Sequence, residues 1–174
     1  MTNMLGRAVV VVVAAVLALL VVGVGTARAE VKEGDRAPEF DNAKRADGKK
    51  FRLKAYKGKW VAVTFGASWC KPCKKELPAW DQLAAKYRGR VEFIAVNIDL
   101  DPVKGKKFLD QLKVRNLTRV FMPEKQTSTV DTYDPGTFPS TFVVDPNGVV
   151  RVVQKGYVSG DDGKMAGRLD GLLK

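Results

Sequence analysis

Two cysteines separated by two residues constrain this chain more than any other feature of its sequence. Cys70 and Cys73 are its only cysteines. An apolar, strand-like run at residues 60–65 precedes them, and a pattern typical of a helix follows. A Cys-x-x-Cys segment where a strand turns into a helix is typical of a dithiol redox centre. We therefore expect Cys70 and Cys73 to form a reversible redox pair.

A zinc site and a permanent bridge fit the composition less well. A structural zinc site needs four ligands, and the chain has no histidine and no further cysteine. A structural disulfide gains most when it closes a long loop, whereas this one would enclose two residues. An inert thiol pair or a permanent bridge stays open as the alternative. We expect no metal and no cofactor.

The net charge of +11 comes from scattered lysines and arginines. Such a balance can indicate a nucleic acid, an anionic membrane surface or only a soluble basic protein. No run of basic residues is interleaved with aromatic ones, so we expect a solvated basic surface and no nucleic-acid partner. Weak attraction to acidic lipid is a secondary possibility.

The N-terminus has the composition of an export signal. Residues 8–25 carry no charge and are mostly Val, Leu and Ala, with Arg7 before them and an A-x-A pattern after them. These are the parts of a secretory signal, although the apolar run approaches the length of a membrane span. We expect residues 1–29 to be a signal peptide or an N-terminal membrane anchor. Residues 30–174 then form one exported domain, periplasmic or anchored on the outer face of the cytoplasmic membrane.

The exported part alternates between strand and helix patterns. Strand, helix and strand within residues 60–98 predict a βαβ unit with a right-handed crossover. Asp-Gly and Asn-Gly pairs between apolar runs are hairpin signals, and Pro78 should kink its helix. We expect a hairpin of residues 40–43 and 50–53, strands at 60–65, 91–98, 117–121, 141–145 and 149–154, and helices at 71–88, 101–112, 127–133 and 160–173.

Three motifs occur in a recognisable order. They are GDRAPEF at residues 34–40, WCKPCKKE at 69–76, and GTFPSTF at 136–142 followed by DPNG at 145–148. With them the chain resembles the thioredoxin superfamily, and within it the TlpA/ResA-like exported thiol–disulfide oxidoreductases. The resemblance implies an α/β, thioredoxin-like fold whose central mixed sheet is flanked by helices. It also implies an inserted helix, which residues 101–112 fit, beside the N-terminal β-hairpin.

The chemistry expected at the pair follows from its place at a helix amino terminus. The attacking species in thiol–disulfide exchange is a thiolate. Backbone N–H groups, the helix dipole and three nearby lysines (Lys71, Lys74 and Lys75) should lower the pKa of the Cys70 thiol. We predict that Cys70 is the exposed nucleophile. Cys73, one turn further and more buried, should resolve the mixed disulfide.

Three residues are expected to bind substrate. In the resembled family a cis proline lies against the disulfide, and Phe138-Pro139 matches that position. The backbone of Phe138 can then pair with an extended substrate strand. A trans proline that only begins the next strand is the alternative. Trp69 is expected to shield the cysteine pair and contact partner proteins, or else only to pack.

A proton acceptor is also needed so that Cys73 can ionise. Many thioredoxins carry a buried acid six residues before the first cysteine, where this chain has Thr64. ResA-like proteins carry a glutamate three residues after the second cysteine, which Glu76 matches. The resemblance therefore implies a catalytic Glu76. An exposed helix carboxylate paired with nearby lysines is the alternative.

The function expected from these features is the reduction of disulfides in exported proteins. By resemblance the substrate could be apocytochrome c before haem attachment, with electrons from a membrane thiol–disulfide donor. An oxidase or isomerase is the alternative, since the two residues between the cysteines do not set the direction of electron flow. A peroxidase and a redox-inert dithiol module for binding or copper delivery are further alternatives. We expect a monomer.

Overall fold

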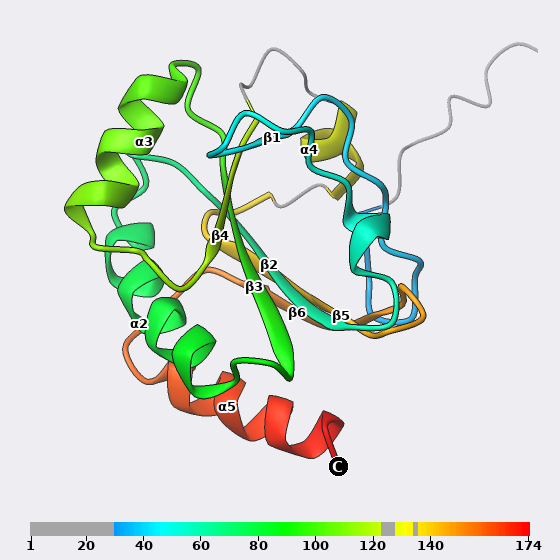
Figure 1. Ribbon diagram of the computed structural model, residues 1–174. Helices are drawn as coiled ribbons and strands as arrows, with labels where there is room; N and C mark the ends of the chain where they lie inside the picture. Colours follow the sequence, from blue (N-terminus) through cyan, green and yellow to red (C-terminus); the bar gives the residue numbers. More distant parts are fainter. Residues whose placement is uncertain (1–29, 123–127, 134–135) are drawn as a thin grey trace, which may run out of the picture.

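Six strands form one mixed sheet in the order β1-β4-β3-β2-β5-β6 (Figure 1). The arrangement is seen in a computed structural model that describes residues 30–122, 128–133 and 136–174. The strands are β1 (Lys44–Arg45), β2 (Trp60–Gly66), β3 (Val91–Asn97), β4 (Thr118–Phe121), β5 (Ser140–Val144) and β6 (Val150–Lys155). The helices are the 3-10 helix η1 (Leu53–Tyr56), α2 (Cys73–Lys86), α3 (Pro102–Gln111), α4 (Ser128–Tyr133) and α5 (Asp161–Leu172).

The directions of the strands bring several loops to one edge of the sheet. β2 and β3 are parallel and joined by α2, and β4 is parallel to β3. β5 is antiparallel to β2, and β6 is antiparallel to β5. The carboxyl ends of β2, β3, β4 and β6 therefore lie beside the amino end of β5. We call this the cysteine edge, and it carries residues 67–73, 98–101 and 136–139.

Alternation along β2 divides its side chains between two cores, as expected for a buried strand. One core lies between the sheet and α2, α3 and α5, and the other lies under the N-terminal segment, η1 and α4 (Figure 1). The β2 residues in the second core are Val61, Val63 and Phe65. Thr64 and Gly66 alternate with them and therefore face α2. The strand thus presents one hydroxyl and one glycine to the helix that begins at Cys73.

The predicted α/β fold and the order of its elements are confirmed. Pro72 is the N-cap residue of α2, so the helix begins two residues later than predicted, and it continues through Pro78. The predicted inserted helix is α3. It begins after Asp101, whose carboxylate accepts a hydrogen bond from the Val103 N–H over 2.9 Å.

The N-terminal hairpin is shorter than predicted. Its turn is present, since the Arg45 N–H donates to the Lys49 carbonyl and the Phe51 N–H donates to the Ala43 carbonyl, each over 2.8 Å. Only Lys44 and Arg45 form a strand, and they pair with β4 at the edge of the main sheet. The predicted arms at residues 40–43 and 50–53 are therefore wrong as strands: across the turn, pairing is limited to one isolated bridge, between Lys44 and Lys50, and the strand lies at Lys44–Arg45, where β4 is a second partner.

Two expectations fall on residues that the structure does not describe. Residues 1–29, the expected signal peptide or anchor, lie outside the described residues, and so does residue 127 at the start of the helix expected at 127–133. Within the described ranges, no helix has the length and apolar character of a membrane span.

Candidate active site

Cys70 and Cys73 form a disulfide at the cysteine edge. The sulfur atoms are 2.05 Å apart and the Cα atoms 5.3 Å apart. The N–H of Cys73, the first residue of α2, donates a hydrogen bond to the Cys70 sulfur over 3.2 Å. The pair therefore lies at a helix amino terminus, where free N–H groups favour negative charge on a sulfur.

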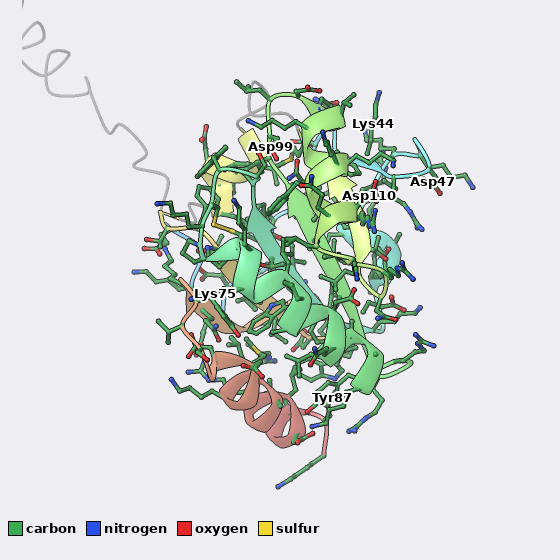
Figure 2. The ribbon with its side chains drawn as sticks, turned by 90° about the vertical axis from the view of Figure 1, so that its left-hand side faces the viewer. Lys44, Asp47, Lys75, Tyr87, Asp99 and Asp110 are labelled. Atoms are coloured by element: carbon green, nitrogen blue, oxygen red, sulfur yellow. A yellow bond between two sulfur atoms is a disulfide. The ribbon has the colours of Figure 1, made fainter. Side chains whose placement is uncertain are left out.

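Cys70 is less exposed than we predicted for an attacking nucleophile. Its exposed fraction is 4%, against 0% for Cys73. The prediction was wrong about exposure because the disulfide joins the Cys70 sulfur to that of Cys73, which is fully buried. The order of the two exposures still matches their predicted roles. The lysines around the pair, including Lys75 near the start of α2 in Figure 2, are exposed.

Gly66, the last residue of β2, allows Cys73 to lie close to the sheet. A Cβ atom at this position would be 3.0 Å from the Cys73 sulfur and 3.5 Å from the Cys73 Cβ. Such a contact is tighter than ordinary van der Waals packing, so a side chain here would push against the Cys73 sulfur. The close approach fixes the second sulfur over the end of β2.

Glu76 is buried next to this contact. Its exposed fraction is 1%, and it accepts hydrogen bonds from the hydroxyls of Thr64 (2.9 Å) and Thr141 (3.1 Å). Glu76 lies about one helical turn after Cys73, on the same face of α2. Thr64 and Gly66, their two contacts, lie two residues apart on one face of β2. The carboxylate and the second sulfur are therefore neighbours along β2.

Burial raises the pKa of Glu76 from its ordinary value of 4.5 to about 8. The hydrogen bonds from Thr64 and Thr141 act against burial, because they stabilise the ionised form, and the negative charge of Asp161 adds to the increase. In the described part of the chain no lysine or arginine pairs with Glu76. The exposed-carboxylate alternative is therefore wrong.

Trp80 and Thr141 extend the site, and sequence reasoning missed both. The indole Nε1–H of the fully buried Trp80 donates to the Thr141 hydroxyl oxygen over 3.1 Å. The Thr141 hydroxyl in turn donates to Glu76. The hydrogen bond from Trp80 therefore orients this hydroxyl toward the Glu76 carboxylate. The available signals were the helical spacing of four residues between Glu76 and Trp80, and a threonine in an otherwise apolar strand.

The three residues predicted to bind substrate also meet at the cysteine edge. The rings of Trp69 and Phe138 are 5.4 Å apart between centroids and nearly perpendicular, at 88°. Trp69 is 54% exposed. The Phe138–Pro139 peptide bond is cis, so the trans alternative is wrong. An exposed aromatic surface therefore lies beside the disulfide.

Comparison with known proteins agrees with this geometry. The AhpC/TSA family model matches residues 33–153. The thiol-disulfide oxidoreductase ResA of Geobacillus thermodenitrificans (strain NG80-2) is 32% identical over 138 residues, which are 79% of this chain and 77% of the relative. The thioredoxin-like protein YneN of Bacillus subtilis (strain 168) is 31% identical over 129 residues, or 74% of this chain and 75% of that protein.

A solved structure extends the similarity to three dimensions. It is a Chlorobium tepidum protein described as a thiol:disulfide interchange protein DsbE, and it is 30% identical to this chain with a TM-score of 0.76. The match covers 83% of this chain and 100% of that one. The similarity in fold therefore extends over most of the chain.

Proposed function

The chain belongs to the AhpC/TSA family and is a thiol–disulfide oxidoreductase with a thioredoxin-like fold, and from this premise we propose that it reduces disulfides in exported proteins. The buried Glu76 carries the proposal. A dithiol that gives two electrons to a substrate must also release its protons. Glu76, with a pKa of about 8, is placed next to Cys73 to accept one of them.

The reaction starts from the reduced pair. The Cys70 thiolate attacks one sulfur of a substrate disulfide, and the other substrate sulfur leaves as a thiolate that takes up a proton. Cys73 then transfers its proton to the Glu76 carboxylate and attacks the Cys70 sulfur. The second substrate thiolate leaves and is protonated. Two electrons have moved to the substrate, and the Cys70–Cys73 disulfide remains.

Glu76 suits this proton transfer because its pKa lies close to neutral pH. A general base works best when its pKa is near the operating pH, since it is then both partly ionised and basic enough to take a proton. An exposed glutamate with its ordinary pKa would be ionised but a much weaker base toward a thiol. Burial thus supplies the property that the Cys73 step requires.

Trp69 and the backbone of Phe138 bind the substrate. Among the described residues, neither the N–H nor the C=O of Phe138 has a backbone hydrogen-bond partner. These groups can pair with an extended segment of the substrate that carries its disulfide, as in strand addition. The exposed Trp69 offers an apolar surface to the same segment. Pro139 holds this backbone at the amino end of β5.

The proposal includes a compartment and an electron source. Residues 1–29 act as a signal peptide or membrane anchor, so the domain works outside the cytoplasm. It works there as a monomer. A membrane thiol–disulfide protein reduces the Cys70–Cys73 disulfide after each turnover. Apocytochrome c, which must keep its own cysteines reduced for haem attachment, is the substrate that the family resemblance supports.

Reduction of insulin tests the activity, with Cys70→Ser as the matched control. We expect turnover by the wild type and only background rates in the variant. Equal rates would defeat the dithiol mechanism. Cys73→Ser should leave Cys70 joined to its substrate, which identifies the physiological target. The reduction potential tests direction: a value well below that of the glutathione pool supports a reductase, and one near that of strong oxidases overturns it.

A further inference from the structure

A second buried acid lies at the cysteine edge, and the mechanism above does not use it. Asp99 follows β3 and is 4% exposed. Its carboxylate accepts hydrogen bonds from the Ser68 N–H (2.9 Å), the Ser68 hydroxyl (2.7 Å) and the Asn97 side-chain amide (2.8 Å). Figure 2 shows Asp99 beside α3, at the opposite end of the molecule from Tyr87. We propose that Asp99 is a positioning residue that holds the segment carrying Trp69 and Cys70.

Ser68 is the point at which Asp99 acts on the active site. Both polar groups of Ser68, its N–H and its hydroxyl, bind the same carboxylate, so the residue is held at two points. Trp69 follows directly. The Cys70 N–H then donates to the Ala67 carbonyl over 3.1 Å, which closes a tight turn. The positions of the indole ring and of the attacking sulfur are therefore set from Ser68.

Asn97 connects the same network to α3. The Asp99 N–H donates to the Asn97 side-chain oxygen over 3.2 Å. A Cβ atom on Gly105 of α3 would lie 2.0 Å from that oxygen. Only glycine lets the α3 backbone pack so closely against Asn97. The buried side chains of Asn97 and Asp99 thus connect three parts of the molecule: α3, the end of β3 and the segment before Cys70.

An acid suits this position because all the groups that face it are donors. Within the described residues, no lysine or arginine forms an ion pair with Asp99. Its two oxygens accept one N–H, one O–H and one amide N–H. An asparagine could keep most of the network, since the Ser68 hydroxyl can rotate and accept a hydrogen bond from its amide. An alanine would leave three donors without this acceptor, two on the half-buried Ser68 and one on the buried Asn97.

Three variants test the proposal: Asp99→Ala, Asp99→Asn and Ser68→Ala. The first readout is the rate at which iodoacetamide alkylates Cys70 in the reduced protein at neutral pH. The second is kcat/KM for insulin reduction. Displacement of a reacting group lowers rates even when the chemistry is unchanged, so we expect Asp99→Ala to lower both about 10-fold. Ser68→Ala should lower them about 3-fold, and Asp99→Asn should stay within about 2-fold of wild type.

Asp145→Ala is the matched control for loss of stability. Asp145 is 5% exposed, lies at the opposite end of the sheet, and accepts the N–H groups of Asn147 and Val149, each over 2.9 Å. Its removal should destabilise the fold to a similar degree while Cys70 keeps its wild-type alkylation rate. If Asp99→Ala behaves in the same way once rates are corrected for the folded fraction, Asp99 has only a structural role.

Further outcomes separate this inference from the function on which it rests. If Asp99→Ala does not fold, Ser68→Ala becomes the test of the proposal. Wild-type rates for Ser68→Ala in both assays would then overturn it. Alkylation of Cys70 needs no substrate. An inactive wild-type protein would therefore count against the proposed reductase, while a slower alkylation in Asp99→Ala would still support the positioning role.

Discussion

Each end of the sheet buries a carboxylate next to β5, and the pKa of one is raised while the pKa of the other is lowered. At the cysteine edge Glu76 receives two hydroxyl hydrogen bonds, and its pKa rises to about 8 because burial dominates. At the other end Asp145, directly after β5, receives two backbone N–H bonds and the guanidinium of Arg151, whose Nη2 is 2.6 Å away. Burial acts on Asp145 as well, but these donors outweigh it, and the pKa lies below its ordinary value.

The comparison shows that the balance between burial and hydrogen-bond donors decides whether an acid can take part in proton transfer. A cation and backbone dipoles keep Asp145 ionised, so it can only hold the turn between β5 and β6. At Glu76 the donors are neutral hydroxyls, which offset burial only in part, so the pKa lies close to neutral pH. Of these two acids, Asp145 has a structural role and Glu76 has a proton that can move, and only Glu76 lies next to a cysteine.

The largest expected effect is on the pH dependence of stability. The folded pKa of Glu76, about 8, exceeds its ordinary value of 4.5, so its contribution is complete below pH 4.5 and is lost as the pH rises to 8. Glu76→Gln should lack this loss. Relative to the variant, oxidised wild type should lose up to about 5 kcal/mol of unfolding free energy across the window. Urea unfolding at stepped pH measures it, and parallel curves would contradict the raised pKa.

Asp145→Asn should show the opposite sign. The pKa of Asp145 is lowered from 3.8, so its stabilisation is present above that pH and is lost as the pH falls through the lowered pKa. The substitution should cost about 2 kcal/mol at neutral pH, and the difference from wild type should shrink in acid. Chemical unfolding between acid and neutral pH measures the effect. Slower insulin reduction by this variant would show that the two ends of the sheet are not independent.

Glu76→Gln should also slow catalysis. Without a proton acceptor beside Cys73, we expect turnover in insulin reduction to fall about 10-fold at neutral pH, and the pH–rate profile to lose the limb near pH 8. Steady-state rates from acid to alkaline pH check this, with Asp145→Asn as the control. A profile of unchanged shape would leave Glu76 with a structural role only.

The elements of the fold and the redox pair could be predicted from the sequence, but the protonation state of Glu76 could not. The apolar runs, the turn residues and the Cys-x-x-Cys segment predicted the strands, the helices and the redox pair. In the run Lys74-Lys75-Glu76 the side chain three residues after Cys73 could face the sheet or the solvent. Only the register between α2 and β2, which brings Thr64 opposite it, decides between the two.

The residues that were missed make contacts across long distances in the chain. Ser68 and Asp99 are 31 residues apart, and Glu76 and Thr141 are 65 apart. No local pattern marks such pairs, because hydrogen bonds between loops and strands depend on strand order. From the sequence, Thr64 indicated only that the buried acid of many thioredoxins is missing at this position. In the structure its hydroxyl donates a hydrogen bond to Glu76, the acid expected to act in its place.

The smallest change that sharpens the comparison is Thr64→Val, which keeps the shape of the side chain and removes one donor. The Thr64 hydroxyl lowers the pKa of Glu76, so its loss should raise that pKa further, by roughly half a unit. The limb of the pH–rate profile that rises toward pH 8 should then move to higher pH, while Thr64→Ser, which keeps the hydroxyl, should leave it in place. A shift to lower pH would mean that the hydroxyl stabilises the protonated acid. In that case the donors around Glu76 would not be what keeps its proton exchangeable near neutral pH, and the contrast would rest on the donors of Asp145, which are Arg151 and two backbone N–H groups.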